Sequence, residues 1–212
     1  MFNYSFIDLD DTLFNTYLFK EDIFGCFERC GVSREDYLDT YRQAVFGPVE
    51  GYFDYTFKKH ADILRELGYQ ITDSTIFELN NLLEKSYNDS QAEEFLLELK
   101  KISHKLILLT AGEQRLQKRK IDSTGLVKYF DQVIIIDGGK SQKIVDVAGQ
   151  ADKILFVNDN LKENNQIKKD LPYVLVVAKK HKILWAEDDY QMSNLPYFDS
   201  LIEIKDYAIS SL

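Results

Sequence analysis

Four short apolar runs alternate with amphipathic stretches in the second half of the chain, and each run ends in a polar turn. The runs cover residues 106–109, 133–136, 154–157 and 173–177. Strands that are apolar throughout and alternate with helices are typical of a parallel sheet with helices on both faces. The pattern therefore predicts an α/β fold for this part of the chain.

A fifth apolar run, residues 4–7, ends in three closely spaced carboxylates, Asp8, Asp10 and Asp11. Side chains alternate along a strand, so Asp8 and Asp10 leave the chain on the same side and converge on one point. Two like charges at that spacing repel each other unless a cation lies between them or one of them holds a proton. An oxygen-rich site of this kind favours magnesium, and the alternative interpretation is an Asp-rich turn.

The stretch between these two parts has helical periodicity and contains no convincing strand. The expected helices lie near residues 20–30, 33–46, 54–67 and from 72 onward. Four short helices of this kind form a small bundle. The expected domains are a discontinuous core of residues 1–16 and 89–212 and a helical insert of residues 17–88.

Polar side chains follow directly on the ends of four of the predicted strands. They are Asp8 with Asp10, then Thr110, Lys140 and Asp159. In an open parallel sheet, ligands bind beyond the carboxyl ends of the strands, near the point where the strand order reverses. Polar turns alone would not produce this complement of acids, a hydroxyl and a lysine. The pattern therefore predicts one site built from four separate turns.

The composition and net charge of the chain limit the kinds of molecule that it is expected to bind. The chain has 212 residues, 45% of them hydrophobic, which suffices for one large domain or one domain with an insert. It carries 35 acidic and 26 basic residues, a net charge of −9 that disfavours nucleic acid and anionic membranes as partners. The densest basic run, residues 118–120, is interpreted as a solvated helix face.

The remaining features indicate a cytoplasmic protein. Acidic residues follow the N-terminus closely without a positive leader, and no apolar run approaches the length of a membrane span. Cys26 and Cys30 lie one helical turn apart in a predicted helix, where two thiols are expected to be packing residues. The sequence indicates no oligomeric state.

With these residues identified, the sequence resembles the haloacid dehalogenase superfamily, in its phosphatase branch with a helical cap inserted after the first strand. The resemblance spans the chain in the expected motif order and implies a Rossmann-like core. Residues 8–13 match the first motif, Asp-x-Asp-x-Thr, and the others are matched by Thr110, by Lys140, and by Asn158-Asp159 with Glu163. Lys143 is the alternative for the third motif. Lys140 is favoured because it precedes Ser141, the expected helix cap.

The resemblance implies a role for each residue at the strand ends. Asp8 attacks phosphorus, and Asp10 protonates the leaving oxygen and later deprotonates water. Mg²⁺ is held by the Asp8 carboxylate, the backbone carbonyl of Asp10 and Asp159. Thr110 and Lys140 contact the phosphoryl oxygens.

Two further residues are expected beside the metal ligands. Glu163 would support the water molecules around the metal, and Asn158 would stand next to Asp159. Both depart from the residues that are most frequent in the family at these positions.

The expected activity is hydrolysis of a small phosphorylated metabolite, such as a sugar phosphate or a nucleotide. A phosphoryl-transferring mutase, a dehalogenase and a catalytically silent phospho-ligand-binding member remain alternatives. A nucleotide-binding phosphate loop around Gly139 is rejected, because position 134, where that loop needs glycine, is Ile134. Substrate choice is assigned to the cap loop of residues 46–53, with Tyr52 and Phe53 as the contacting side chains.

Overall fold

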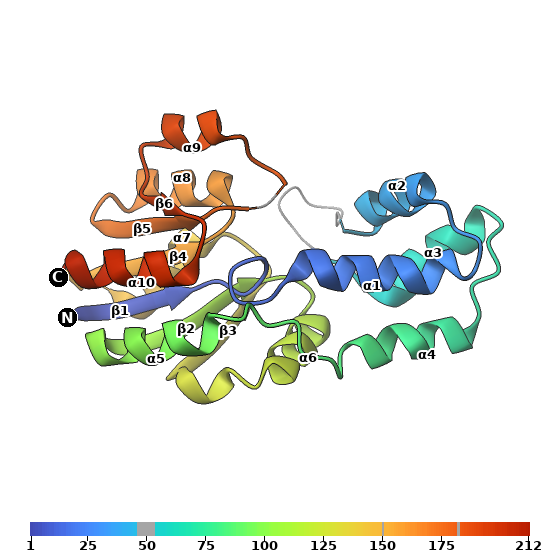
Figure 1. The fold of residues 1–212 in the computed structure, drawn as a ribbon, viewed down its shortest axis with the longest axis horizontal. Coiled ribbons are helices and arrows are strands. Elements are labelled where there is room, and N and C mark those ends of the chain that lie inside the picture. The colour runs from blue at the N-terminus through green and yellow to red at the C-terminus, as the bar shows by residue number, and fades with distance from the viewer. Residues whose placement is uncertain (46–53, 150, 182) are drawn as a thin grey trace.

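The chain folds around one sheet of six parallel strands, seen in the computed structural model, which describes residues 1–45, 54–149, 151–181 and 183–212 (Figure 1). The strand order is β3-β2-β1-β4-β5-β6. The strands are β1 (Phe2–Ile7), β2 (Ser103–Ala111), β3 (Gln132–Ile136), β4 (Ile154–Asn158), β5 (Val174–Lys179) and β6 (Tyr197–Phe198). The predicted α/β fold with a Rossmann-like parallel sheet is confirmed.

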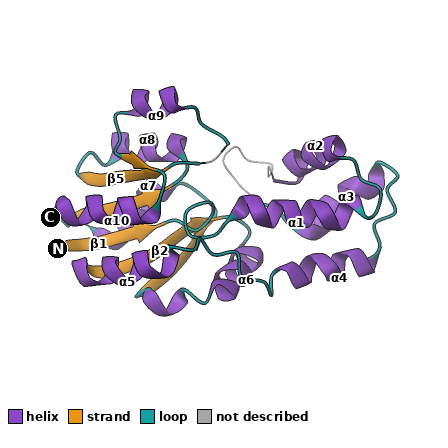
Figure 2. Ribbon diagram, viewed as in Figure 1, coloured by secondary structure: helices purple, strands orange, loops and turns teal. Residues whose placement is uncertain are grey.

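Helices cover both faces of the sheet (Figure 2). One face packs against α5 (Ala92–Ile102) and α10 (Leu201–Ser210), and the other against α7 (Lys140–Ala148) and α8 (Leu161–Asp170). Because side chains alternate along a strand, neighbouring residues of β1 enter different cores: Ile7 packs with the α5 side and Phe6 with the α7 side. Burial on both faces explains why the strands are apolar throughout.

The order of the strands places β1 at the switch point of the sheet. The chain passes from β1 to β2 and β3 on one side, and then returns to β4 on the other side of β1. Ile7, at the end of β1, pairs with Leu108 of β2 and Val157 of β4. Asp8 and the residues after it therefore lie where a ligand is expected in a sheet of this topology.

Four helices lie beyond the carboxyl ends of the strands, away from both termini (Figure 1). They are α1 (Thr16–Glu28), α2 (Arg34–Val45), α3 (Phe57–Glu66) and α4 (Asp73–Leu82). We refer to them as the cap. The domain division into residues 17–88 and the rest stays a prediction, and the predicted substrate contacts Tyr52 and Phe53 fall outside the described residues.

Some elements differ from their predicted bounds. α1 begins at Thr16, earlier than expected, because the Asn15 side chain accepts a hydrogen bond from the Leu18 backbone N–H at 3.0 Å and caps the helix there. The sequence pattern did not show α9 (Glu187–Ser193) or β6, because seven and two residues are too short for a periodicity. The remaining elements are α6 (Gln114–Thr124) and the short helix η1 (Val127–Tyr129).

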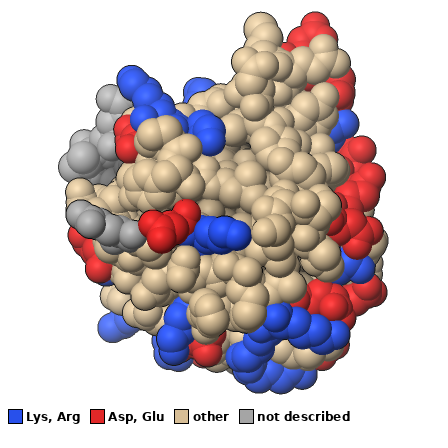
Figure 3. Space-filling model, turned by 90° about the vertical axis from the view of Figure 1, so that its left-hand side faces the viewer, with Lys and Arg blue, Asp and Glu red and all other residues tan. Residues whose placement is uncertain are grey.

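Charged side chains of both signs lie on the surface of the molecule. Figure 3 shows the end of the molecule that carries both termini, where Lys and Arg lie in small groups beside Asp and Glu. In the part of the chain that the structure describes, no helix has both the length and the apolar character needed to cross a bilayer.

The cap is organised around one buried imidazole, that of His60. Its Nδ1 lies 3.1 Å from the Tyr55 hydroxyl and its Nε2 lies 2.9 Å from Thr40 Oγ1. Thr40 donates its own hydrogen to the Asp36 carbonyl at 2.6 Å, so it accepts from Nε2–H, and Nδ1 accepts from Tyr55. Burial without a charged partner lowers the pKa of His60 to about 4.

We predict that His60 stays neutral in the folded protein down to acidic pH. Its ring resonances in NMR spectra should stay constant from about pH 8 to pH 5 and move only near pH 4, whereas the same ring in urea-unfolded protein should titrate near 6.5. Because only the unfolded state binds the proton in between, His60 removes stability as pH falls from 6.5 through 4. A folded-state midpoint near 6.5 would contradict the buried, neutral assignment.

Candidate active site

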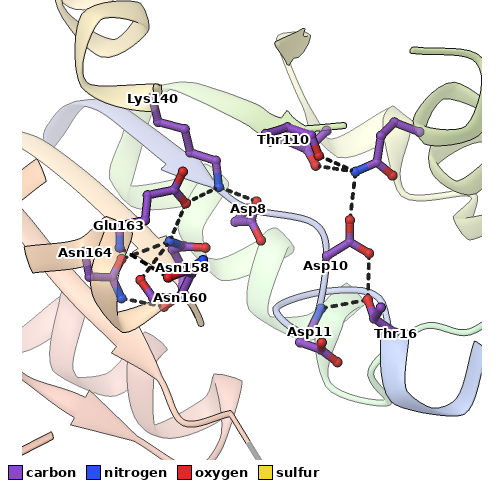
Figure 4. Close-up of polar contacts among 12 residues, drawn as sticks. Asp8, Asp10, Asp11, Thr16, Thr110, Lys140, Asn158, Asn160, Glu163 and Asn164 are labelled. Atoms are coloured by element: carbon purple, nitrogen blue, oxygen red, sulfur yellow. Dashed lines mark hydrogen bonds and ion pairs between the residues drawn. The ribbon is translucent and has the colours of Figure 1, made fainter. Parts of the chain in front are cut away.

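Asp8 is the first residue after β1 and lies almost fully buried at the switch point. Its Oδ1 lies 2.6 Å from Lys140 Nζ, and the same ammonium lies 2.7 Å from Glu163 Oε2 (Figure 4). Lys140 opens α7 after β3, and Glu163 lies in the first turn of α8 after β4. Three different strand ends therefore bring one lysine between two carboxylates.

The surroundings of Asp8 disfavour its charged form in the absence of a cation. Burial raises the pKa of Asp8 most, and the charges of Glu163 and Asp10 raise it further. Lys140 lowers it, and the net result is a pKa of about 6. A further positive group beside Asp8 would restore an ordinary carboxylate, the form that a nucleophile needs.

Asp10 is held by three groups from two helices. Its Oδ1 accepts from the Thr16 hydroxyl of α1 at 2.6 Å, and its Oδ2 accepts from the Gln117 amide of α6 at 2.7 Å (Figure 4). Lys120 of α6 also pairs with Oδ1. Burial raises the pKa of Asp10, but the charge of Lys120 and these hydrogen bonds outweigh it and lower the pKa to about 2.

These contacts correct one expectation. Lys120 is not part of a solvated helix face: it is 5% exposed, packed near the rings of Phe14 and Phe19, whereas Lys118 of the same basic run is exposed. The adjacent buried ammonium also favours the carboxylate form of Asp10. The proton that Asp10 is expected to hold at the first step of the reaction stays a prediction.

Thr110, near the end of β2, is buried and shares the Gln117 amide with Asp10. Gln117 Nε2 lies 3.0 Å from Thr110 Oγ1 and 2.8 Å from the Ala111 carbonyl. This close packing requires glycine at position 112, where φ is +146° and a Cβ would approach the Gln117 side chain to 3.0 Å. The Gln117 amide of α6 thereby ties the hydroxyl of Thr110 to the carboxylate of Asp10.

The structure brings Lys140, rather than Lys143, to Asp8. Lys143 does not belong to the described lining of the pocket. The expectation that Ser141 caps the helix after Lys140 is wrong. α7 begins at Lys140 with Gly139 as its N-cap, so Ser141 lies inside the first turn and does not cap the helix.

Asn158 and Glu163 form a hydrogen-bonded unit at the end of β4. The Asn158 amide donates to Glu163 Oε2 at 2.9 Å and to Asn164 Oδ1 at 3.1 Å, and Asn164 donates back to the Asn158 carbonyl at 3.0 Å. The described contacts of the Glu163 carboxylate are thus with Lys140 and Asn158. This places Glu163 where it positions the lysine, and its predicted support of metal-bound water stays a prediction.

Asp159 lies between Asp8 and a second group of polar residues. Oxygen atoms of Asp11 and Asp159 and a ring nitrogen of His181 lie within 4.8 Å of one another. Burial and the charges of Asp8 and Asp11 raise the pKa of Asp159 well above its usual range. Asp11 itself adopts a left-handed backbone conformation, with φ of +52°, at the turn that points its side chain this way.

The hydrogen bonds of His181 identify it as a donor to Asp11. Its Nδ1 accepts from the Ile183 and Leu184 backbone N–H groups, each at 3.1 Å, so the neutral ring carries its proton on Nε2. Nε2 lies 3.2 Å from Asp11 Oδ2. His181 therefore orients Asp11, and oxygen atoms remain the available metal ligands.

The acids of the site, Thr110, Gln117 and the two paired lysines line one pocket of about 290 Å³ between the sheet and the cap, whereas His181 lies outside its lining. Its described lining holds six carboxylates, including Asp8, Asp11 and Asp159, against three lysines. An excess of buried negative charge with raised pKa values and oxygen donors fits a hard divalent cation. The acidic cluster required for such a metal is thus present.

Several residues of the site escaped prediction from sequence. Lys120, Gln117 and Thr16 hold Asp10, and His181 holds Asp11. One signal was visible: Gln117 and Lys120 lie three residues apart, on the helical stripe that continues to the apolar Ile121. His181 follows β5 at the same edge as the other strand-end residues, but a single histidine in a loop carries no pattern.

We predict that Lys120→Met lowers the free energy of unfolding by about 1–3 kcal/mol, less than for a fully buried pair because the Asp10 side chain is 31% exposed. Lys118→Met, which breaks an exposed pair on the same helix, should cost less than about 0.5 kcal/mol. Urea denaturation measures both. Adding Asp10→Asn to Lys120→Met should recover part of the loss, and an unchanged stability of Lys120→Met would refute the pairing.

The fold is similar to that of several solved structures. L-2-haloacid dehalogenase from Xanthobacter autotrophicus has a TM-score of 0.69 and 18% identity, with 98% of each chain covered. YfnB from Bacillus subtilis, assigned as a HAD-hydrolase and bound to magnesium, has a TM-score of 0.65 and 15% identity, with 97% of this chain and 98% of that chain covered. A Thermotoga maritima protein assigned as a β-phosphoglucomutase has a TM-score of 0.71 and 14% identity, with 99% and 100% covered.

At these identities the likeness establishes the fold, and the sequence itself establishes the family. No curated protein matches the sequence at a significant level. Residues 5–162 match the haloacid dehalogenase-like hydrolase family, and they include Asp8, Asp10, Thr110, Lys140 and Asp159. The chain therefore belongs to the haloacid dehalogenase-like hydrolases.

Proposed function

We propose that this hydrolase is a magnesium-dependent phosphomonoesterase that acts through an aspartyl-phosphate on Asp8. The observation that supports it most is the arrangement of Asp8, which is buried, paired with Lys140 at 2.6 Å and close enough to Asp159 to raise the pKa of that carboxyl. A cation that neutralises the two carboxylates would also attract a phosphate dianion. The substrate is a small phosphorylated metabolite.

The first half of the reaction uses Asp8 as the nucleophile. A carboxylate oxygen of Asp8 forms a bond to phosphorus while the bond from phosphorus to the ester oxygen breaks, and that oxygen departs with the electron pair as an alkoxide, which becomes the alcohol when it takes up a proton. Lys140 and the Thr110 hydroxyl stabilise the charge on the phosphoryl oxygens. Glu163, at 2.7 Å from Lys140 Nζ, keeps that ammonium in place.

The metal site of the proposal consists of the Asp8 carboxylate, Asp159 and the backbone carbonyl of Asp10, with Asp11 beside Asp159. Bound Mg²⁺ supplies positive charge that reduces the repulsion between the nucleophile and the phosphate. His181 holds Asp11 by its Nε2–H, which limits the freedom of the acidic cluster.

The second half of the reaction uses Asp10 as the base. Asp10 removes a proton from a water molecule, whose oxygen attacks phosphorus and releases the Asp8 carboxylate and inorganic phosphate. The ionised state that Lys120 favours suits this step. To protonate a poor leaving group in the first half, Asp10 would have to acquire a proton when the substrate enters.

Three alternative activities can be distinguished from phosphomonoester hydrolysis by experiment: halide removal, phosphoryl transfer and binding without turnover. Halide removal is supported less, because a halide leaving group needs no proton from an acid such as Asp10 and no metal ligand such as Asp159. A mutase would transfer the phosphoryl group to a second hydroxyl, and a silent member would bind a phosphorylated ligand without turnover. Phosphate release and halide release, measured on the pure protein, separate these activities.

We predict that Mg²⁺ stabilises the folded protein. At about 100 times its dissociation constant, Mg²⁺ should add about 2.7 kcal/mol to the free energy of unfolding and raise the melting temperature. Asp159→Asn should remove this increment, and Asp146→Asn, an exposed change on α7, should keep it. An equal response of wild type and Asp159→Asn to Mg²⁺ would exclude Asp159 from the metal site.

We predict that Asp8→Asn lowers phosphate release from an aryl phosphate by about 1,000-fold or more, since the amide cannot act as the nucleophilic oxygen. The change is nearly isosteric, so the circular dichroism spectrum should be preserved. Asp131→Asn, a change at a turn outside the pocket, serves as the control for activity. Turnover close to wild type in Asp8→Asn would disprove the mechanism, and halide release from a 2-haloacid by the wild type would identify a dehalogenase instead.

A further inference from the structure

The cap side of the pocket has a different chemistry from the catalytic side. Apart from Thr16, which holds Asp10, six described residues in the cap helices or next to them line it: Phe19, Lys20 and Ile23 of α1, Tyr41 and Val45 of α2, and Tyr55 before α3. Three of the six are aromatic, two are aliphatic, and one is a cation. α1 runs directly from the turn that holds Asp10 into the cap, so this wall faces the same space as Asp8 (Figure 1).

Tyr55 is a fixed part of the wall. Its hydroxyl donates to His60 Nδ1 at 3.1 Å, and the Thr40 contact on the other side of the imidazole fixes the direction of that hydrogen bond. Tyr55 is 8% exposed and packs edge-on against Phe57. Its ring therefore offers a rigid apolar surface, and its hydroxyl hydrogen is already used within the cap.

Tyr41 is the most accessible ring of the wall. It is half-buried, and its centroid lies 5.0 Å from that of Tyr55 with an angle of 43° between the rings. Burial raises the pKa of Tyr41, and the charges of Asp10 and Asp11 raise it further, which places this side chain within electrostatic reach of the catalytic acids. The two tyrosines form a corner of aromatic surface above the catalytic acids.

Lys20 adds one positive charge to this corner. Its Nζ lies 5.2 Å from the centroid of Tyr41. Lys120 and Lys140, the other two lysines of the pocket, are both paired with carboxylates of the site. Among the described residues, no carboxylate lies within ion-pair distance of Lys20. Lys20 is therefore a cation at the cap wall that a ligand can approach.

We propose that this pocket selects phosphomonoesters whose leaving group carries a single planar aromatic ring with an acidic or electron-rich substituent. The ring would pack in the corner of Tyr41 and Tyr55, and the substituent would face Lys20. This inference rests on the proposed phosphatase function and specifies its substrate class. A volume of about 290 Å³ lies at the small end of the range for ligand pockets, which fits a phosphate and one ring.

The same wall disfavours sugar phosphates. A polyol needs a hydrogen-bond partner for each buried hydroxyl, and unpaired hydroxyls are costly. The described cap wall offers only the Lys20 ammonium, the Tyr41 hydroxyl and the acceptor side of Tyr55. Aromatic side chains, in contrast, favour offset or edge-on contacts with another ring at centroid distances like those within the wall.

The first test compares three esters of primary alcohols, so that the departing oxygen is of the same type: benzyl phosphate, cyclohexylmethyl phosphate and glucose 6-phosphate. With Mg²⁺, we expect kcat/KM for benzyl phosphate to exceed that for glucose 6-phosphate by about tenfold or more and that for cyclohexylmethyl phosphate by about threefold. The cyclohexyl ring has a similar size but no planar face. Equal values for all three would overturn the inference.

The second test removes the aromatic corner. Tyr41→Leu should reduce the preference for benzyl over cyclohexylmethyl phosphate to about twofold or less, whereas Tyr41→Phe, which keeps the ring, should retain it. Phe77→Leu, an exposed cap residue outside the pocket, is the control for the substitution type. A preference that survives in folded Tyr41→Leu would refute the role of this ring, and its loss in Tyr41→Phe would assign selection to the hydroxyl instead.

The third test addresses the cation. Lys20→Met should lower kcat/KM for carboxybenzyl phosphates by about tenfold and that for benzyl phosphate by about twofold or less. Lys58→Met makes the same change of charge on an exposed part of the cap. Equal losses on both esters would exclude a contact between Lys20 and the substituent. Absence of phosphate release from every ester would overturn the proposed function itself, whereas turnover without aromatic preference overturns only the substrate class.

Discussion

The crowding of carboxylates at the carboxyl ends of β1 and β4 is the constraint on which the rest of the site depends. Asp8, Asp10, Asp11 and Asp159 converge there because the strand order reverses at β1. Like charges buried at this spacing are unstable unless each is neutralised. The raised pKa values of Asp8 and Asp159 show that the protein's own positive groups do not fully neutralise these two carboxylates.

The surrounding elements divide that charge into groups with different partners. Lys140 is shared between Asp8 and Glu163 and does not outweigh the burial of Asp8, whereas Lys120 and the other hydrogen-bond donors to Asp10 outweigh its burial. Two carboxylates two residues apart therefore have opposite pKa shifts. His181 donates to Asp11, whereas the pKa values of Asp159 and Asp8 stay raised by burial and by neighbouring carboxylates. Environments that separate the pKa values of neighbouring acids are typical of sites where one acts as nucleophile and another as base.

The sequence predicted the parts of the molecule that follow a regular pattern. The apolar runs identified the parallel strands, and their polar ends identified Asp8, Thr110, Lys140 and Asp159 at one edge. Lys120 was misinterpreted because a basic residue in a basic run looks solvated, and only packing of α6 against Phe14 and Phe19 buries it. His181 depends on the turn after β5, whose two backbone N–H groups determine its tautomer. Contacts of this kind arise from tertiary structure and leave no periodicity in the sequence.

The central claim is that Asp8 carries a phosphoryl group during turnover. The most direct measurement is acid quenching in the first turnovers with an aryl phosphate and Mg²⁺, followed by mass spectrometry of the peptides. Our account predicts a transient increase equal to the mass of one phosphoryl group, located on Asp8 and absent when the substrate is omitted. Release of phosphate with no adduct on Asp8 at any quench time, or with the adduct on another residue, would contradict it.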